Sequence, residues 1–464
     1  MITPDAILAR TTLLAQDHLL LNPAEVDVPR AFTSTTVGLV VDSALLEHCG
    51  FVVAMETLRV LLAGMCVGLR VEIQGRDRPA HLGPPFAQGH WLDALAEYRS
   101  DACAPMSVGK LDSGCSLRIG LGVSDGQFDF ELAADQTTSW LRGTGARPAW
   151  QRSTIWSGAG AAVLAAAEIY KSVLAGLGIA VRQDSDLHPV RDFHWRLADY
   201  GPASAHGRVG VVSAGAITTS ALFMLARARI ALQLDVWDGD TLKLPNFNRY
   251  PLFDVRHLDM LKVDALANLD LPMLMVNPIP RGFDSQEAPE ARTFLVGADR
   301  IAPRWDVARR RPAIAIVGST EHYLTLDSIH RDDRDGCPAC LHPRDDEVDG
   351  DVPTVSFVSF AAGLEVALLL HGSRRHPWPL RGVRRDDAVE IRQVQVGWRN
   401  QSDEPLHQLP RAEHQRHAFL RLVRVAPVVT PREPRLGHRA ARSIADEPQQ
   451  ALPVVRADGG VRMK

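Results

Sequence analysis

The sequence predicts an α/β protein made of two related halves, each with a mainly parallel β-sheet. A strand-like run at Val37–Val41, an apolar stretch to about Leu62 and a second strand-like run at Val67–Ile73 follow one another. This order of strand, helix and strand is typical of a parallel sheet. A buried-strand run at Arg208–Val212 starts the same order again. Both observations favour an α/β fold over an all-helical or all-β one.

The other elements of the first half follow from the alternation of apolar and polar stretches. Residues 74–115 are rich in Gly, Pro and polar side chains and are expected to form loops. Strands are expected at 117–123 and 128–132, and a helix of small residues at 158–174. The alanines of this helix suit close packing against a sheet or a partner. The polar residues 181–207 are interpreted as a linker.

The second half is expected to hold a helix at 213–228, strands at 230–237, 293–296 and 313–317, and a closing helix at 358–370. The helices at 158–174 and 358–370 resemble each other, because both contain small residues and one glutamate and end near glycine. This weak internal repeat indicates two related α/β halves. A chance likeness between two apolar helices is the alternative.

Four segments are therefore expected along the chain. A degenerate α/β domain occupies residues 1–180, the linker 181–207 and a second α/β domain 208–372. A C-terminal extension at 373–464 contains one strand-like run and an Arg- and Pro-rich tail.

The composition excludes several classes of protein. The chain has 464 residues, of which 46% are hydrophobic and 23% charged, as in ordinary globular proteins. A net charge of −4 provides no strong field for nucleic acid or an anionic membrane. Six cysteines in so long a chain do not form a disulfide scaffold. No signal peptide and no transmembrane run is recognised, so a reduced, cytoplasmic setting is expected.

A glycine turn is expected directly after the strand at Arg208–Val212. The sequence Ser213-Ala-Gly215-Ala-Ile-Thr218 stands where nucleotide-binding folds place a turn with three glycines. Gly215 keeps one of these glycines, and Ser213 and Thr218 replace the others. A side chain at position 218 would crowd either the phosphates or the contact between helix and strand. An ordinary strand-to-helix turn is the alternative.

Charged residues follow the next strands in an order that suits a nucleotide. Asp238 and Asp240 end the second strand of this half, and Asp238 lies 23 residues beyond Gly215. An acid at this position can bind ribose hydroxyls. Arg249 and Lys262 follow and can bind polyphosphate oxygens. Each residue alone fits a solvated surface, but their shared position at strand ends favours a site.

Asn246 and Asp299 extend this pattern. Asn246 opens the motif Asn246-Phe-Asn-Arg249, and Asp299 ends a later strand. A carboxylate there can hold Mg²⁺, which prefers one or two carboxylates together with substrate phosphates.

The combined pattern resembles the ThiF/MoeB/E1 superfamily of ubiquitin-like protein activators over about residues 190–372. It consists of Asp238-Gly-Asp240, Asn246-Phe-Asn-Arg249, Lys262, Asn277-Pro278, Asp299, Cys337-Pro-Ala-Cys340 and Ala362-Gly-Leu-Glu365. The resemblance implies a Rossmann-like adenylation domain. Such enzymes use Mg-ATP to adenylate the C-terminal carboxylate of a small ubiquitin-like protein or ribosomal peptide, and they release pyrophosphate.

The resemblance also implies roles for single residues. Asp238 and Asp240 match the ribose-binding acids, and Asn246, Arg249 and Lys262 match residues that bind the ATP phosphates. Asp299 matches the catalytic, metal-linked aspartate. Family members carry an arginine upstream of the first strand that reaches a partner's ATP, and Arg196 is the nearest candidate here.

Cys337 and Cys340 match the first half of the family's four-cysteine zinc site. No cysteine follows Cys340, so a zinc ion would need other ligands. The histidines available for this are His342, His407, His414 and His417. Two buried thiols without metal are the alternative.

The cysteine positions also bear on the type of reaction. No cysteine lies between Asp299 and Cys337, where the family's thioester-forming residue is usually found. Cys49, Cys66, Cys103 and Cys115 lie in the other half and are expected to be core or loop thiols. The sequence therefore predicts acyl-adenylate formation without covalent transfer.

The first half lacks the glycine turn and the acidic and Asn-x-x-Arg motifs. It is expected to be an inactive half, so that the chain forms an internal pseudo-dimer in place of a homodimer. An unrelated substrate-binding domain is the alternative for this half. For the whole protein, the alternative to an adenylyltransferase is a non-catalytic scaffold that presents a peptide or small protein to a partner enzyme.

Overall fold

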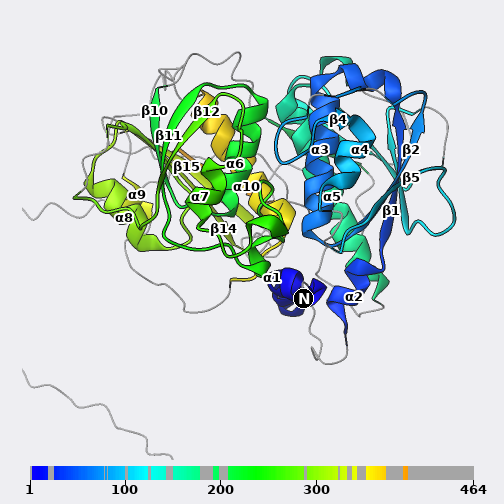
Figure 1. Ribbon diagram of the computed structural model, residues 1–464, viewed down its shortest axis with the longest axis horizontal. Coiled ribbons are helices and arrows are strands. Elements are labelled where there is room, and N and C mark those ends of the chain that lie inside the picture. Colours follow the sequence, from blue (N-terminus) through cyan, green and yellow to red (C-terminus); the bar gives the residue numbers. More distant parts are fainter. Residues whose placement is uncertain are drawn as a thin grey trace, which may run out of the picture. The chain divides into compact units, whose positions relative to one another are not determined.

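Two β-sheets with one common strand order form the framework of the protein (Figure 1). The computed structural model describes residues 3–18, 26–77, 79–80, 82–99, 103–123, 127–142, 150–177, 192–197, 207–286, 290–321, 324–331, 337–341, 352–372 and 390–395. Within these residues, each of the two sheets has seven strands, and a two-stranded hairpin lies beside them.

The first sheet has the order β5-β2-β1-β6-β7-β8-β9. Its strands are β1 (Thr36–Asp42), β2 (Gly68–Gln74), β5 (Met106–Val108), β6 (Leu117–Leu121), β7 (Phe130–Ala134), β8 (Thr138–Arg142) and β9 (Asp192–Arg196). The hairpin joins β3 (Pro79–Ala80) to β4 (Gly89–His90). The first five strands in this order pair in parallel, and the pairings of β7 with β8 and of β8 with β9 are antiparallel.

The second sheet has the order β12-β11-β10-β13-β14-β15-β16. Its strands are β10 (Arg208–Val212), β11 (Leu232–Trp237), β12 (Leu274–Ile279), β13 (Thr293–Val296), β14 (Ile314–Glu321), β15 (Leu324–Arg331) and β16 (Glu390–Gln395). Its first five strands in this order also pair in parallel, and the pairings of β14 with β15 and of β15 with β16 are antiparallel. Position by position, the two sheets have the same order and the same strand directions. The expected α/β fold is confirmed, and the common strand order agrees with the expectation of two related halves.

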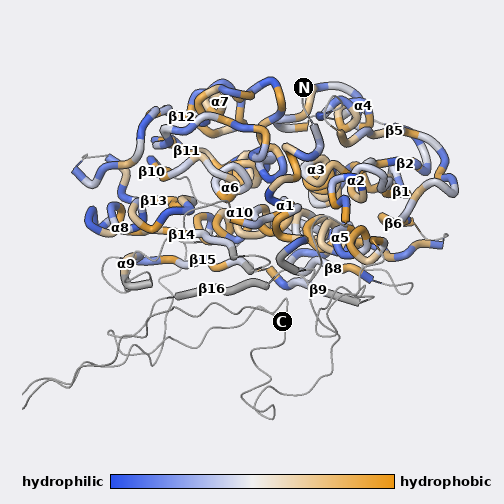
Figure 2. The backbone as a smooth tube through the Cα atoms, turned by 90° about the horizontal axis from the view of Figure 1, so that it is seen from below, coloured by the Kyte–Doolittle hydropathy of each residue, from blue (hydrophilic) through white to orange (hydrophobic). Residues whose placement is uncertain are grey.

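The helices of the described residues are α1 (Pro4–His18), α2 (Val28–Thr33), α3 (Cys49–Gly64), α4 (Trp91–Glu97), α5 (Ile155–Gly176), α6 (Ala216–Arg227), α7 (Lys262–Ala267), α8 (Ile301–Arg309), α9 (Pro338–Leu341) and α10 (Ser356–Gly372). Figures 1 and 2 show α3 and α5 beside the first sheet, α6 and α10 beside the second, and all four between the sheets. Both sheets belong to one unit, Met1–Val428.

Small residues let these four helices approach closely. A Cβ atom on Gly158 of α5 would lie 1.8 Å from the carbonyl oxygen of Gly50 in α3. In the second half, a Cβ atom on Gly363 of α10 would lie 2.6 Å from the carbonyl oxygen of Ile217 in α6. Only glycine fits either position, because real Cβ atoms do not come this near to a backbone oxygen. Each of the two helix pairs therefore has one point of close backbone approach that requires glycine.

Some sequence-based expectations are corrected by these elements. Strand β9 lies inside the predicted linker at 181–207, and β16 lies inside the predicted C-terminal extension, yet each completes a sheet. The predicted loop region 74–115 contains α4 and β5. Strands β12 and β15 were not expected. Strands β9, β12 and β16 lie at sheet edges, and β15 is an antiparallel strand between β14 and β16, so that pairing partners rather than local sequence decide their structure. The four domain boundaries stay predictions, and the tail beyond β16 lies outside the described residues.

Helix α5 bears on the expected absence of a membrane-spanning segment. Of the described helices, only α5 is long and apolar enough to cross a membrane, which the sequence analysis did not anticipate. Its most apolar window is 89% buried inside the protein, where it packs against α3, α10 and the first sheet. The core helix of a globular domain has the same length and composition.

Candidate functional site

The carboxyl ends of three neighbouring strands of the second sheet meet at one edge. The backbone N–H of Ser213, after β10, donates to the carbonyl of Trp237 in β11 over 2.9 Å. The N–H of Gly297, after β13, donates to the carbonyl of Val212 over 3.1 Å. Gly215 is the N-cap residue of α6 and lies between them. Ligands of open α/β sheets bind at this position, where the strand order reverses.

Asp238 joins the glycine turn to the segment that follows β11. Its Oδ2 atom accepts hydrogen bonds from the N–H of Ala214, over 2.8 Å, and from the hydroxyl of Ser213, over 3.3 Å. Its Oδ1 atom accepts one from the N–H of Asp240 over 2.9 Å. Both carboxylate oxygens of this buried residue are therefore used within the protein.

Lys262 bridges the two aspartates that the sequence placed in the site. A bridge between Thr241 and Leu261 brings the start of α7 over Asp240. The Nζ atom of Lys262 then lies 2.8 Å from Oδ2 of Asp240 and 3.6 Å from Oδ2 of Asp238. The side chain of Asp240 is 76% exposed, whereas that of Lys262 is 9% exposed. The ammonium group is thus held at the floor of the site and Asp240 at its rim.

The electrostatics of this cluster keep both partners charged. Burial lowers the pKa of Lys262, but the groups of Tyr250, Asp238 and Asp240 outweigh it and raise the pKa above its ordinary value. The hydrogen bond from Lys262 lowers the pKa of Asp240, against a smaller opposing effect of burial, and the charges of Lys262, Lys243 and Arg300 add to the lowering. The cluster therefore presents a fixed positive charge beside an exposed carboxylate.

The turn before α6 keeps a glycine-like backbone although only one glycine remains. Ser213 has a φ angle of 78°, in the left-handed region that favours glycine. A serine in this conformation costs about 1 kcal/mol, and such strain is concentrated at functional sites. A Cβ atom on Gly215 would lie 3.2 Å from the hydroxyl of Ser213, so the backbone there is tightly surrounded but not blocked.

Thr218 lies at the contact between helix and strand, the second of the two positions expected for it. It is fully buried, and a Cβ atom on Gly297 would lie 2.5 Å from its Oγ1 atom. The threonine therefore occupies space that Gly297 leaves open at the end of β13. Its hydroxyl has no hydrogen-bond partner within the part of the chain that the structure describes.

The Asn-x-x-Arg motif forms a short helical turn and a loop next to this cluster. The side chain of Asn246 accepts a hydrogen bond from the N–H of Lys243 over 2.9 Å and so caps its own turn. The Nη1 atom of Arg249 donates to the carbonyl of Pro245, over 2.9 Å, and to the side chain of Asn248, over 3.0 Å. The hydroxyl of Tyr250 lies 3.8 Å from the Cβ position of Gly215, so the loop adjoins the glycine turn.

Two predicted site residues differ in their placement. Asp299 is exposed just after β13 and precedes Arg300, whose charge acts on Asp240, so it lies at the same sheet edge. Arg196 is exposed at the end of β9, where it pairs with Thr138 in the first sheet. The structure therefore brings Gly215, Asp238, Asp240, Arg249, Lys262 and Asp299 toward one edge, and places Arg196 in the other sheet.

The zinc half-site stays a prediction. Cys337 is exposed next to the short helix α9. The side chain of Cys340 and the histidines considered as further ligands lie outside the described residues. Among the residues that are described, no three His, Cys, Asp or Glu side chains gather in a way that would hold a metal ion.

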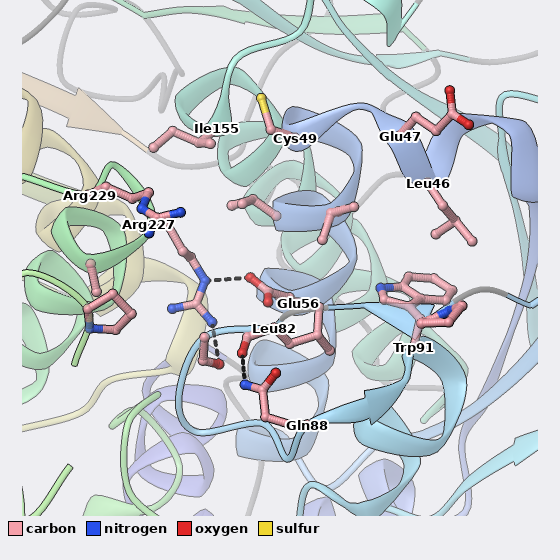
Figure 3. A pocket seen from close by; sticks show the side chains of 16 residues that line it. Leu46, Glu47, Cys49, Glu56, Leu82, Gln88, Trp91, Ile155, Arg227 and Arg229 are labelled. Carbon is pink, nitrogen blue, oxygen red and sulfur yellow. Dashed lines mark hydrogen bonds and ion pairs between the residues drawn. The ribbon is translucent and has the colours of Figure 1, made fainter. Parts of the chain in front are cut away.

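A cavity of about 650 Å³ lies between the two halves, at the start of α3 (Figure 3). Apolar side chains of α3 and of the loop before α4 line it, and Arg227 and Arg229 from the end of α6 close one side. A second cavity of about 410 Å³ lies between residues 84–86 and residues 256–270. Neither is lined by the strand-end residues. Cys49 reaches the first cavity and is exposed, whereas Cys66 is buried and Cys103 and Cys115 are half-buried.

Sequence reasoning missed three residues that shape the site. Tyr250 and Arg300 directly follow Arg249 and Asp299, so their neighbours in the sequence could have indicated them. Arg99 comes from the first half and holds the loop after Asn246. No sequence signal connects it to that loop, because the contact depends on the packing of two halves.

Comparisons with known proteins give distant likenesses only. No protein-family model matches the sequence, and no curated protein matches it. Similar solved structures include E. coli MccB with succinimide and MccB with ATP, both at 17% identity and a TM-score of 0.32. They cover 42% of this chain and 61% and 60% of theirs. PaaA is similar at 16% identity and a TM-score of 0.29, over 41% of this chain and 61% of its own. The chain thus spans about three fifths of these proteins, and values this low carry no argument about activity.

Proposed function

We propose that the protein is an ATP-dependent adenylyltransferase that activates the C-terminal carboxylate of a peptide or small ubiquitin-like protein as an acyl-adenylate. The observation that carries the proposal is the cluster of Asp238, Asp240 and Lys262 beside the turn at Gly215. The exposed carboxylate of Asp240 can accept hydrogen bonds from ribose hydroxyls, and the protonated amine of Lys262 can bind phosphate oxygens. The sequence resemblance set out above adds the type of reaction, and the proposal does not rest on the distant structural neighbours.

The two aspartates have different proposed roles. Asp238 uses both oxygens to hold the turn and the backbone of residue 240, so it shapes the site. Asp240 is exposed and has lone pairs left for the ribose hydroxyls of ATP. Lys262, at the floor of the site, and Arg249, in the adjoining loop, are the cations proposed to bind the phosphates.

The reaction needs positive charge more than covalent chemistry from the protein. A carboxylate oxygen of the substrate attacks the α-phosphorus of ATP, and the bond from that phosphorus to pyrophosphate breaks. Both reactants are anionic, so fixed cations that already face the phosphates lower the barrier. Asp299 is exposed at the same edge and is the residue proposed to hold Mg²⁺ together with phosphate oxygens.

The first half is proposed to be the inactive member of an internal pseudo-dimer. The common strand order of the sheets and the close glycine contact within each helix pair support this proposal. The strand-end cluster has no counterpart in the sequence of the first half. A cytoplasmic setting is part of the proposal, because the reaction consumes ATP.

The scaffold alternative remains because Ser213 and Thr218 replace two glycines of the nucleotide turn. The left-handed backbone at Ser213 favours an enzyme over a scaffold, since strained backbone of this kind is concentrated at functional sites. Thr218 is buried at the strand contact, where it does not face the turn's outer side.

ATP–pyrophosphate exchange tests the proposal directly. The purified protein, with a candidate peptide or small ubiquitin-like protein as substrate, should incorporate labelled pyrophosphate into ATP. Lys262→Met and Asp299→Ala should each reduce exchange at least about a hundredfold. Asp93→Ala, at an exposed position of α4, is the matched control and should have no effect. Peptide binding without ATP binding or exchange would contradict the enzyme and favour the scaffold.

A further inference from the structure

A buried arginine of the first half holds the loop that carries Arg249 in the second half. Arg99 follows α4, is 4% exposed and has a φ angle of 50°. Its Nε and Nη2 atoms donate to the carbonyl of Phe253 over 3.2 and 2.5 Å. Nη2 also donates to the carbonyl of Tyr250 over 2.8 Å, and Nη1 to that of Phe247. One guanidinium group thus binds three carbonyls of a single loop.

The loop needs such a donor because it has little regular structure of its own. Residues 247–253 form successive turns, and most of them are buried. Carbonyl groups buried without a partner cost about 1–3 kcal/mol each. The planar fork of Arg99 satisfies three of them at once and lies over the ring of Phe247, 5.8 Å from its centre. No other side chain type offers several donors in one rigid plane.

A second buried arginine holds the segment from which Arg99 extends. Arg59 of α3 donates to the carbonyls of Leu95, over 2.9 Å, Tyr98, over 2.5 Å, and Ala104, over 3.0 Å. Burial lowers the pKa of Arg59 to about 10, so it stays protonated at neutral pH. Arg59 therefore fixes the end of α4, and the end of α4 fixes Arg99.

The same loop is held by the first half at two further points. The hydroxyl of Tyr98 donates to the carbonyl of Pro251 over 3.1 Å. The buried side chain of Asn248 donates to the hydroxyl of Thr11 in α1 over 3.2 Å, while its oxygen accepts from Arg249. The orientation of the Arg249 guanidinium therefore depends on contacts that come from the first half.

We propose that Arg99 is a positioning residue, which orients Arg249 toward the phosphates of the nucleotide and makes the first half a working part of the site in the second. This inference rests on the proposed function, because it assigns the nucleotide site to that strand edge. It gives the inactive half a role in catalysis through a residue that acts on Arg249 and not on the nucleotide itself.

Arg99→Lys is the variant that tests the proposal. Lysine keeps the charge but loses the fork, so it can satisfy one or two of the carbonyls at most. We expect the KM for ATP in pyrophosphate exchange to rise about tenfold while kcat falls less than about threefold. In an Arg249→Ala background the same change should leave the KM for ATP unaltered, since Arg99 acts through Arg249. A further rise of the KM in that background would overturn the proposal.

The control separates positioning from general loss of stability. Arg227→Lys also weakens a buried arginine between the halves, but Arg227 donates to Glu56 and to the carbonyls of Gly83 and Pro84 and to none in the 247–253 loop. If Arg227→Lys lowers the melting temperature as much as Arg99→Lys does, Arg227→Lys should still leave the KM for ATP unchanged. An equal rise of the KM in this control would also overturn the proposal.

Hydrogen exchange without nucleotide provides a readout that does not depend on activity. Amides of residues 247–253 should exchange at least about tenfold faster in Arg99→Lys than in the wild type and in Arg227→Lys. Unchanged exchange in this loop would overturn the positioning role. If the wild type shows no ATP binding, the proposed function fails, whereas faster exchange would still support the hold of Arg99 on the loop.

Discussion

Gly64, at the end of α3, lies directly against the backbone of Asn248, so that a Cβ atom on the glycine would lie 2.2 Å from the carbonyl oxygen of Asn248. The first residue belongs to the half without nucleotide motifs, and the second stands inside the Asn246-Phe-Asn-Arg249 motif. The backbones of the two halves therefore approach each other closely next to the proposed phosphate-binding loop.

Gly64→Ala should destabilise the protein, although glycine to alanine within a helix usually stabilises. The added methyl group would force the 246–250 segment away from α3, at a cost of about 2 kcal/mol in the free energy of unfolding. ATP affinity should fall as well, because Arg249 would move with the segment. Denaturant unfolding and calorimetry measure the two effects.

Gly176→Ala is the control for this change. Gly176 ends α5, and a Cβ atom there meets no atom within 4 Å. This variant should unfold at the same denaturant concentration as the wild type or at a slightly higher one. Equal behaviour of the two alanine variants would show that the close approach at Asn248 is not a constraint.

Thr218→Gly is expected to destabilise the protein and not to tighten ATP binding. The sequence alone left open whether Thr218 crowds the phosphates, but its side chain is buried against Gly297. Its removal leaves a small void and puts a glycine in the first half of α6, which together cost about 1–2 kcal/mol. Tighter ATP binding in this variant would contradict the placement.

Asp254 should make stability depend on acid pH. Burial raises the pKa of this carboxyl, but its contact with His257 and the hydrogen bonds from the side chain and backbone N–H of Arg256 outweigh burial and hold the pKa well below the ordinary 3.8. A lowered pKa in the folded state gives stability that is present above about pH 4 and is lost as the pH falls through the folded-state value. Asp254→Asn should therefore cost about 1–2 kcal/mol at pH 7. The difference from the wild type in urea unfolding should shrink toward pH 2, and a constant difference would contradict this.

The fold class and the site in the second half could be predicted because both depend on local sequence patterns. Strands β1 and β10 are nearly continuous apolar runs, a pattern typical of parallel strands buried on both faces, and β2 and β11 are apolar runs interrupted by single polar residues. Asp238 and Asp240 directly follow such a run, so their place at the sheet edge could be predicted. The outer strand β16 was predicted as a strand from the alternating run Val389–Val396, but this run does not indicate which sheet it joins, and β9 has no such pattern.

Contacts between the halves could not be predicted from the sequence. Arg99 and Phe247, whose carbonyl it binds, are 148 residues apart, and no motif of either residue points to the other. Likewise, nothing near Arg196 indicates that its strand joins the first sheet and not the second. Local patterns predict elements and strand ends, whereas the packing of two sheets through four helices arises only in the folded chain.

The zinc prediction needs a direct measurement of metal content. If Cys337 and Cys340 bind zinc together with histidines, elemental analysis should find about one zinc ion per chain. Cys337→Ser should lose that ion, and a chelator should lower the melting temperature of the wild type to that of the variant. Exposed Cys49→Ser is the matched control and should keep its metal content. Metal-free wild type of equal stability would show that the pair is not a metal site.

The last prediction concerns the ion pair between Glu56 of α3 and Arg227 of α6, which Figure 3 shows at the wall of the larger cavity. Their side chains are 3% and 5% exposed, and Nε of Arg227 lies 2.5 Å from Oε2 of Glu56. Burial raises the pKa of Glu56 and lowers that of Arg227, against their mutual attraction. Each charge is therefore costly without its partner.

Glu56→Leu should lower the free energy of unfolding by about 3 kcal/mol, because it leaves a buried guanidinium whose remaining partners are carbonyls. Arg227→Met should cost a similar amount for the converse reason. The double variant should lose less than either single variant, since it replaces both charges by apolar side chains of similar size. Guanidinium chloride unfolding of the four proteins measures the coupling. If the two single losses add up in the double variant, the pair does not act as a unit and the contact between α3 and α6 depends on apolar packing alone.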